Sequence, residues 1–564
     1  MVPEAPSGPP LRRSTGVGRS AALEGLLVAL ATAASLLPFA DKAFHIDDPL
    51  FLWVGRHVQA HPFDFYGFEV NWYGYEAPIS EIVKNPPGAG WLIGIAAGLL
   101  GWSEPALHLA FLIPAVGVVL GTYALGRRLT PRPLVAALFT LWTPAFLVSS
   151  TQVMCDVPML CLWVWALVLW IVGLERDHLG WLLAAGVLVA ACALTKYFGI
   201  ALIPLLLVYS WAERRRPGRW LAALLVPVAA LAAYQMWTAS LYGRGLLLDA
   251  AQYATTVRLV GATLLEKPMT GLVFTGGCLV SIVVLLPWLA SRRVLALAGV
   301  AAAALTLLLL LLLGGSLGNL SLVDAAGVRW LPTLQLAAFA LSGLICLALV
   351  LGDLARHRDA PSLLLALWVL GTFSFATFFN WSVNGRSVLP MVPAVGLLVA
   401  RRMASRPVDP RRLVPAFAAA AALALVPTWA DYRLANASRA AASRVFAEHV
   451  RGNEGVWFQG HWGFQYYMEA AGARPFDSRR PAFRPGDLLV TPVNNTNMYR
   501  LPAAWFDEHV RLFEETTGWV ATQDKRVHAG FYAAVFGPLP FVFAAVPPEE
   551  YFVSRVARPT GAPR

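Results

Sequence analysis

The sequence predicts a polytopic α-helical membrane protein that ends in a small external α/β domain. Three observations support this fold class. The chain of 564 residues is 57% hydrophobic and only 14% charged, which lies well outside the range of soluble proteins. It contains a series of apolar runs of roughly 17–25 residues, the length with which an α-helix crosses a bilayer. Beyond residue 430 the charged residues return and the apolar runs become shorter.

The chain begins with residues 1–19, a polar stretch with three arginines that we expect to be a disordered cytoplasmic tail. The apolar run 20–40 follows it. This run is too long for the core of a signal peptide, and no cleavage site of the A-x-A type comes after it. We therefore interpret it as an uncleaved signal anchor and as the first membrane span.

About thirteen spans are expected in the region 20–430, and each is an apolar run with few charges. Their predicted bounds are 20–40, 105–126, 133–150, 157–174, 181–195, 198–212, 219–240, 270–290, 294–313, 332–352, 362–380, 388–400 and 413–429.

The basic residues of the connecting loops predict the orientation. With the N-terminus in the cytoplasm, twenty arginines fall on the inner side and nine basic residues on the outer side, as the positive-inside rule requires. A fourteenth apolar stretch, 88–101, would invert every later loop if it crossed the bilayer. It is therefore expected to be an interfacial or re-entrant helix, and residues 41–104 to form one long external loop.

Residues 431–564 are then external as well. Short apolar segments such as GVWFQG, GDLLVTPV and FYAAVFGPLPFVFAA are typical of strands, whereas 461–472 and 501–515 are predicted to be helices. We expect a small soluble α/β domain resting on the membrane.

Two adjacent acids, Asp47 and Asp48, follow the first span in the stretch FHIDDPLF. Ionisable residues near membrane depth are functional candidates. A simpler interpretation is a helix cap, because Pro49 suits the first position of a helix and helix starts favour acids. One acid satisfies that role, so the second calls for another explanation.

Three more charged residues lie at the outer ends of spans, namely Asp156, Lys196 and Arg386. Snorkelling of a long side chain to the interface is an alternative for Lys196 and Arg386. Together with the acidic pair these residues suit transfer from an anionic, membrane-anchored donor. A carboxylate can take a proton from an acceptor hydroxyl, and basic side chains can hold a phosphate while negative charge grows on it.

The sequence resembles the polytopic GT-C glycosyltransferases that use polyprenyl-phosphate sugars, above all the protein O-mannosyltransferases and the lipid A aminoarabinose transferases. Four stretches, spread over roughly residues 20–430, support the resemblance: HIDDPLF after the first span, KNPPGAGWLIG before a short helix, CDVPML at the start of the fourth span, and GRSVLPMVP late in the membrane region.

The resemblance implies a role for each matching residue. Asp47 aligns with the general base toward the acceptor, Asp48 with the second acid of the pair, and Asp156 with the acid of the next external loop. Lys84 and Arg386 align with residues that contact the donor phosphate. The implied reaction is a single inverting displacement at the anomeric carbon, with the lipid phosphate as leaving group.

This chain departs from the family pattern at two positions. Leu50 stands where relatives often have an arginine, and Arg56 is the candidate substitute for donor-phosphate binding. Ser387 follows the late arginine where relatives have a tyrosine. Histidines of the first external loop can also ligate a divalent metal. Relatives differ in whether they need one, so metal dependence is open.

The expected partners are a polyprenyl-phosphate sugar donor, a lipid, glycan or protein acceptor and the bilayer, and no nucleic acid. The expected location is the plasma membrane. A transporter or flippase for a lipid-linked sugar is the main alternative, and a glycan polymerase or ligase would share the same chemistry. A non-catalytic membrane scaffold would leave the acids and Lys84 without a role. Aromatic residues of HWGFQYYMEAAG are expected either to shape acceptor access or to form an ordinary core: His461, Trp462, Tyr466 and Tyr467.

Overall fold

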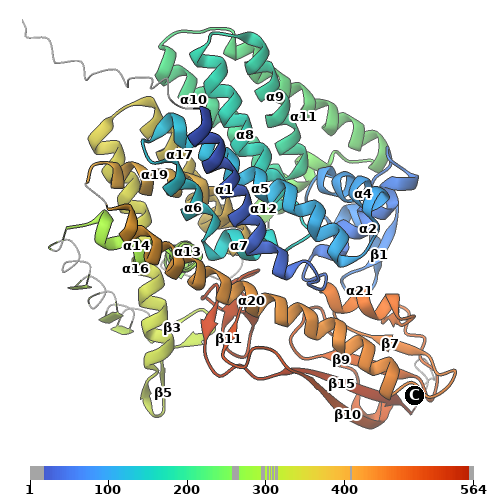
Figure 1. Cartoon of the computed structure of the whole chain (residues 1–564). Coiled ribbons are helices and arrows are strands. Elements are labelled where there is room, and N and C mark those ends of the chain that lie inside the picture. Colours follow the sequence, from blue (N-terminus) through green and yellow to red (C-terminus); the bar gives the residue numbers. More distant parts are fainter. Residues whose placement is uncertain are drawn as a thin grey trace, which may run out of the picture.

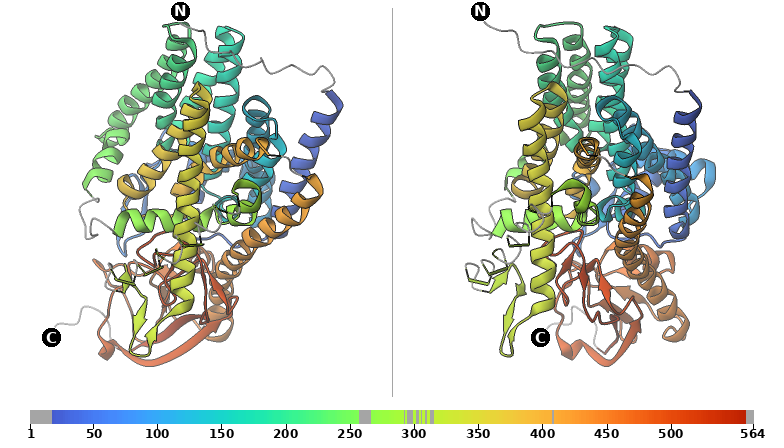
Figure 2. Two further views of the ribbon diagram at one scale, coloured as in Figure 1. Left: turned by 90° about the vertical axis from the view of Figure 1, so that its left-hand side faces the viewer. Right: turned by 60° about the vertical axis from the view of Figure 1, so that its left-hand side comes forward.

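A bundle of long helices stands on a β-rich C-terminal region in the computed structural model of the chain (Figures 1 and 2). The structure describes residues 18–256, 266–291, 315–406 and 409–557, and a few single residues between 293 and 311. The predicted fold class is confirmed, since apolar helices make up the first part and strands gather in the last. The predicted tail 1–19 lies, apart from its last two residues, outside the described part.

The helical part contains short 3-10 or π segments as well as α-helices. The helices are α1 (Gly18–Leu36), η1 (Leu37–Phe39), α2 (Asp48–Ala60), α3 (Ile79–Ile82), α4 (Gly88–Leu100), α5 (Glu104–Leu129), α6 (Pro133–Leu141), α7 (Pro144–Ser150), α8 (Asp156–Glu175), α9 (Leu179–Thr195), η2 (Tyr197–Ala201), α10 (Leu202–Arg214), α11 (Trp220–Tyr242), α12 (Leu246–Thr256), α13 (Glu266–Cys278), α14 (Ile282–Leu289), α16 (Trp330–His357), α17 (Ala360–Ser374), η4 (Phe375–Phe379), α18 (Gly385–Val388), η5 (Leu389–Met391), α19 (Val392–Ala404) and α20 (Pro410–Glu448).

Eight helices of the described part are long and apolar enough to cross a membrane, and the number rises to ten if each of two bent pairs forms one span. The predicted count of thirteen is therefore not confirmed. Two of the predicted spans, 181–195 and 198–212, correspond to the shorter helices α9 and α10. Most of the predicted span 294–313 lies outside the described residues.

The two bent pairs replace the straight spans predicted at 133–150 and 270–290. Helices α6 and α7 meet at 61°, and α13 and α14 meet at 84°. At the first bend the side chain of Thr143 accepts a hydrogen bond from Phe146 N, and Pro144 opens α7. A polar cap followed by proline starts a new helix, so one apolar run yields two helices.

The first external loop of the prediction is folded against the bundle. It contains α2, the hairpin of β1 (Glu69–Asn71) and β2 (Glu76–Pro78), and α4. Helix α4 covers the predicted stretch 88–101 and packs against α2, with Gly90 and Gly94 facing Val54 and the Gly55 carbonyl at distances that leave little room for a side chain. Small residues thus let the two helices approach closely.

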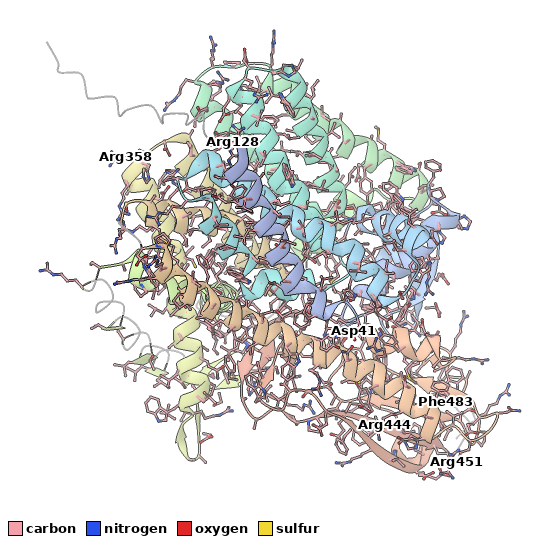
Figure 3. The ribbon with its side chains drawn as sticks, viewed as in Figure 1. Asp41, Arg128, Arg358, Arg444, Arg451 and Phe483 are labelled. Carbon is pink, nitrogen blue, oxygen red and sulfur yellow. The ribbon has the colours of Figure 1, made fainter. Side chains whose placement is uncertain are left out.

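Charge is distributed unevenly along the bundle. Arg128 and Arg358, both counted on the inner side by the prediction, lie at the end of the helices that points away from the C-terminal region, whereas Asp41 lies where the bundle meets that region (Figure 3). The positive-inside rule expects arginines to gather at the cytoplasmic ends of the helices, and the positions of Arg128 and Arg358 agree with it.

Helix α20 joins the bundle to the C-terminal region as one continuous element of 39 residues. It passes through the predicted domain boundary at residue 430 without a break. The other elements of this region are β7 (Val456–Phe458), α21 (Trp462–Ala470), β8 (Arg474–Pro475), β9 (Leu488–Pro492), η6 (Ala503–Trp505), β10 (Phe506–Glu514), β11 (Val520–Ala521), β12 (Gln523–Asp524), β13 (Ala529–Gly530), β14 (Val542–Phe543) and β15 (Glu549–Val556); the strands β3 (Ser316–Leu317), β4 (Leu320–Ser321), β5 (Val323–Asp324) and β6 (Gly327–Val328) precede α16.

A five-stranded sheet in the order β10-β15-β9-β7-β8 forms the centre of the C-terminal region. Strands β7 and β9 are parallel and confirm two of the predicted strands. The prediction of a helix at 501–515 is wrong, because residues 506–514 form β10 and pair antiparallel with β15. In β10 only Leu512 is buried. Val510, two residues before it and on the same face of the strand, is half-buried. Pairing with the neighbouring strand outweighs the local preference of this charged segment.

Candidate active site

The acidic pair does not cap the helix that it precedes. Helix α2 begins at Asp48, with Asp47 in the cap position and Pro49 in the first turn, and the Asp47 side chain makes no capping hydrogen bond. The oxygens of Asp48 accept from the backbone N–H groups of His45, at 2.8 Å, and Val153, at 2.9 Å. Neither carboxylate therefore caps α2.

Asp47 forms an ion pair with Arg386. The distance between Oδ2 of Asp47 and Nη1 of Arg386 is 2.9 Å, and the two side chains are 29% and 17% exposed. Arg386 lies on α18, a single helical turn whose start is capped by the Asn384 side chain. The sequence placed these residues on one face of the membrane, and the structure brings them into contact.

Asp156 and Lys196 form a second ion pair close by. Asp156 is the first residue of α8, and Lys196 directly follows α9. The thiol of Cys155 lies among these charges. Burial and the Asp156 carboxylate raise its pKa to about 12, and Lys196 and Arg386 act in the opposite sense. Four predicted or suspected charged residues thus gather at one place, with Arg386 beside both acids.

Lys84 lies in a neighbouring cluster. Its Nζ is 2.7 Å from Oδ2 of Asp249 on α12 and 5.6 Å from the ring centre of Tyr253. Burial, the phenols of Tyr253 and Tyr75 and, to a smaller degree, the Asp47 carboxylate raise the pKa of Tyr73 to about 12. Asp249 was not recognised in the sequence.

Arg56 contacts none of the other predicted site residues. Its guanidinium lies over the rings of Trp102 and Tyr466, at 5.0 and 5.6 Å, and Nη2 donates to the Tyr466 hydroxyl at 3.1 Å. It stands nine residues after Asp47 on α2, which is about 13 Å along a helix axis. These contacts join α2 to α21.

Asp48 is completely buried. Burial is the main cause that raises the pKa of its carboxyl to about 7, against the two backbone hydrogen bonds and the positive charge of Lys42. A carboxyl without access to solvent cannot meet an acceptor directly. Its two hydrogen bonds instead fix the loop that carries Asp47 to the turn before α8.

A buried polar cluster that the sequence did not reveal lies behind this loop. Asp431, on α20, pairs with Lys42 at 2.5 Å, and both side chains are 0% exposed. Nitrogen Nε2 of Gln152 and the hydroxyl of Tyr532 donate to Oδ2 of Asp431 at 2.9 and 2.7 Å. The hydroxyl of Thr522 donates to Oδ1 at 2.9 Å.

The cluster is connected to the ion pair of Asp47. The ring of Tyr532 lies 5.6 Å from the guanidinium of Arg386 and 5.6 Å from the ring of His45. Lys42 and Asp431 could have been found in the sequence, because each is a charged residue that follows an apolar run. The same kind of position, before a run, identified Asp156. Tyr532 lies in an irregular segment and carried no such signal.

The aromatic residues of the HWGFQYYMEAAG stretch connect the C-terminal region to the bundle. The hydroxyl of Tyr467 accepts from Phe44 N at 2.8 Å and donates to Glu104 at 2.9 Å. The ring of Trp72 lies against His461. They therefore do not form a core of the C-terminal region alone, and their role in acceptor access stays a prediction.

A metal site is not evident in the described part of the chain, where no group of three or more histidine, cysteine, aspartate or glutamate side chains converges. Of the loop histidines, His57 contacts the Asp64 carbonyl at 2.7 Å. Burial lowers the pKa of His45 to about 4.

The family model described as dolichyl-phosphate-mannose-protein mannosyltransferase matches residues 84–237. The matched stretch includes Lys84, Asp156 and Lys196, whereas Asp47 and Arg386 lie outside it. No curated protein sequence matches the chain.

Solved structures that resemble the chain are distant. An Archaeoglobus fulgidus oligosaccharyltransferase tethered with an acceptor peptide is 13% identical, with a TM-score of 0.47 over 82% of this chain and 64% of that one. ArnT from Cupriavidus metallidurans bound to undecaprenyl phosphate is 14% identical, with a TM-score of 0.42 over 85% and 94%. The mycobacterial arabinofuranosyltransferase AftD is 13% identical, with a TM-score of 0.39 over 96% and 40%. The chain thus spans less than two thirds of the length of the first of these proteins.

The predicted resemblance to the polyprenyl-phosphate-dependent glycosyltransferases is confirmed by the mannosyltransferase family model over residues 84–237.

Proposed function

We propose that this protein is a membrane glycosyltransferase that moves a sugar from a polyprenyl-phosphate donor to an acceptor hydroxyl on the outer face of the membrane, with inversion. The observation that carries the proposal is the ion pair between Asp47 and Arg386, at 2.9 Å and partly exposed to solvent. The pair brings together a carboxylate that can act as a base and a guanidinium that can bind phosphate. The reaction needs both groups.

Arg386 would bind the donor phosphate. A guanidinium recognises phosphate oxygens through paired hydrogen bonds, and its present partner is a carboxylate that the phosphate can replace. Lys196, held by Asp156, and Lys84, held by Asp249, supply further positive charge nearby. Asp156 thereby acts as a positioning residue for the lysine.

Asp47 would then be free to accept a proton. In the reaction an oxygen of the acceptor attacks the anomeric carbon, its proton passes to Asp47, and the bond between that carbon and the phosphate oxygen breaks. The phosphate leaves with one more negative charge than it had in the diester, and Arg386 stabilises this charge. Asp47 is partly exposed and Asp48 is buried, so an acceptor can reach Asp47 and not Asp48. This difference favours Asp47 as the base.

Transfer of radiolabel tests the proposal. The purified full-length protein is incubated with radiolabelled polyprenyl-phosphate mannose and a membrane extract as acceptor. We expect label in the acceptor fraction with the wild type, and a loss of about 100-fold or more in Asp47→Asn. Asp41→Asn is the matched control, because Asp41 is an exposed acid of the same loop whose only partner in the described residues is the Tyr432 hydroxyl.

Two outcomes would contradict the proposal. Transfer by Asp47→Asn at the wild-type rate would remove the assigned base. Movement of the labelled lipid across a vesicle membrane without any transfer of label would favour the flippase alternative.

A further inference from the structure

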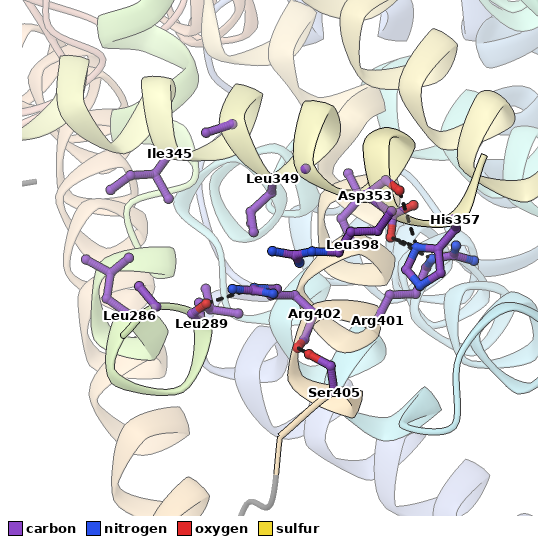
Figure 4. A pocket seen from close by; sticks show the side chains of 14 residues that line it. Leu286, Leu289, Ile345, Leu349, Asp353, His357, Leu398, Arg401, Arg402 and Ser405 are labelled. Atoms are coloured by element: carbon purple, nitrogen blue, oxygen red, sulfur yellow. Dashed lines mark hydrogen bonds and ion pairs between the residues drawn. The ribbon is translucent and has the colours of Figure 1, made fainter. Parts of the chain in front are cut away.

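A cavity of about 300 Å³ lies between α14, α16 and α19 (Figure 4). One part of its wall is apolar and includes Leu286, Ile345 and Leu349. The other part is basic and includes Arg356 and Arg402. Such a combination of walls fits an amphipathic ligand.

The apolar and basic parts are separated along α16. Ile345 and Leu349 lie deeper in the helix, and Arg356 follows in its last turn. Eleven residues separate Ile345 from Arg356, which corresponds to roughly 16 Å along the helix. The basic end belongs to the helix ends that the distribution of arginines predicts to face the cytoplasm.

The single carboxylate of the wall is already satisfied. Asp353 is 7% exposed and accepts from Arg401 Nε at 2.9 Å and from the Ser362 hydroxyl at 2.8 Å. Nδ1 of His357 lies 3.1 Å from the same carboxylate oxygen, Oδ1, that Arg401 contacts. Arg401 also approaches Asp359, at 3.6 Å. Asp353 therefore has little charge left for the two remaining arginines.

Arg356 and Arg402 have no carboxylate partner within the described residues. The one polar contact given for Arg402 is donation from Nε to the Leu289 carbonyl at 2.9 Å. Three guanidiniums and one carboxylate line the cavity, so its net charge is +2 with His357 neutral. Two guanidiniums without a carboxylate partner attract an anion, and the apolar wall beside them favours one that has an apolar tail.

We propose that this cavity binds the phosphate head group and the upper acyl chain of an anionic phospholipid. Basic pockets between membrane helices bind such head groups. The phosphate would lie between Arg356 and Arg402, and the chain would cover Leu286, Ile345 and Leu349. A free phosphate ion would satisfy the arginines but leave the apolar wall against water, so the apolar wall favours a lipid.

Gly352 offers a way to close the cavity without changing its charge. It lies on α16 in the wall, and a Cβ atom added there meets no other atom within 4 Å. A leucine at this helical position therefore grows into open space. Gly371, on the exposed side of α17, has equally free surroundings and provides the matched control.

Lipid retention tests the proposal. The full-length protein is exchanged into mixed micelles of phosphatidylglycerol or phosphatidylcholine, repurified, and its bound lipid is counted by native mass spectrometry. We expect retained phosphatidylglycerol on the wild type and roughly thirtyfold weaker binding in Arg356→Gln/Arg402→Gln, from about fivefold per arginine. Gly352→Leu should also lose the lipid, although all its arginines remain.

Matched variants separate this site from general attraction to the membrane. Arg215→Gln/Arg216→Gln removes two arginines from a neighbouring loop outside the cavity, and Gly371→Leu adds the same bulk elsewhere. Both should retain the lipid as the wild type does. Equal melting temperatures in phosphatidylcholine would show that all variants are folded.

Three results would overturn the proposal. The first is retention by Gly352→Leu and by the cavity double variant at the wild-type level. The second is equal retention of phosphatidylcholine by the wild type. The third is full displacement of phosphatidylglycerol by inorganic phosphate, which would assign the site to a free anion.

Discussion

Lys42 and Asp431 are 389 residues apart in the sequence and form an ion pair with no exposure to solvent. Lys42 follows α1 and η1, and Asp431 lies in α20, the last helix of the bundle. The pair joins the two ends of the helical part behind the loop that carries Asp47. Its surroundings, with Gln152 and Tyr532 as further donors to Asp431, make it a structural element of the candidate site.

Breaking this pair should destabilise the protein. Asp431→Asn leaves the Lys42 ammonium buried without a counter-charge, and such a loss costs about 3–5 kcal/mol. Thermal unfolding in detergent should show a clear decrease in melting temperature. Lys42→Met/Asp431→Asn should recover part of it, because no lone charge remains. An unchanged melting temperature in Asp431→Asn would mean that the pair is not buried as described.

Tyr532 should act as a positioning residue for Arg386. Tyr532→Phe keeps the ring over the guanidinium and loses the hydroxyl that donates to Asp431, whereas Tyr532→Ala loses both. A cation–π contact of this kind contributes about 0.5–2 kcal/mol. Kinetics with the labelled donor should therefore show a higher KM for the donor in Tyr532→Ala than in Tyr532→Phe. Equal KM values in both variants would exclude a role for the ring.

The buried carboxyl of Asp48 should make stability depend on pH. Its pKa is about 7 in the folded protein and 3.8 in its ordinary state. Between these values the folded state keeps a proton that the unfolded state releases, so the free energy of unfolding falls as the pH rises from about 4 to 7. Asp48→Asn cannot titrate, and the difference between the two unfolding curves should follow this slope. A difference that does not change with pH would contradict the burial of this group.

Arg56 should matter for packing more than for the donor. Its guanidinium lies over Trp102 and Tyr466, and removal of such contacts costs about 0.5–1 kcal/mol at an exposed site. We expect Arg56→Gln to melt slightly earlier and to keep transfer within about threefold of the wild type, which corresponds to an energy below 1 kcal/mol. A loss as large as that of Asp47→Asn would restore the phosphate-binding role implied by the family resemblance.

Charged residues at the ends of apolar runs were predictable, because a charge near the membrane is unfavourable unless a partner or a function offsets the loss of water. Asp47, Asp156 and Arg386 were found in this way, and the structure brings them together. Their partners were not predictable, since the pairing of Lys84 with Asp249 depends on how distant loops fold over one another. Hydropathy also missed the bend before α7, although Thr143 and Pro144 are a recognisable helix start. Strand β10 escaped because its partner β15 lies far along the chain.

The sequence separation of Lys42 and Asp431 has a consequence for biosynthesis. Lys42 leaves the ribosome long before its counter-ion, since 389 residues separate it from Asp431. At about 5–20 residues per second, the lysine waits roughly 20–80 s for Asp431 and longer still for Tyr532. During that time the ammonium has to remain in water or among lipid head groups. The loop bearing Asp47 can therefore reach its final place only after the segment that carries Asp431 and Tyr532 has been made.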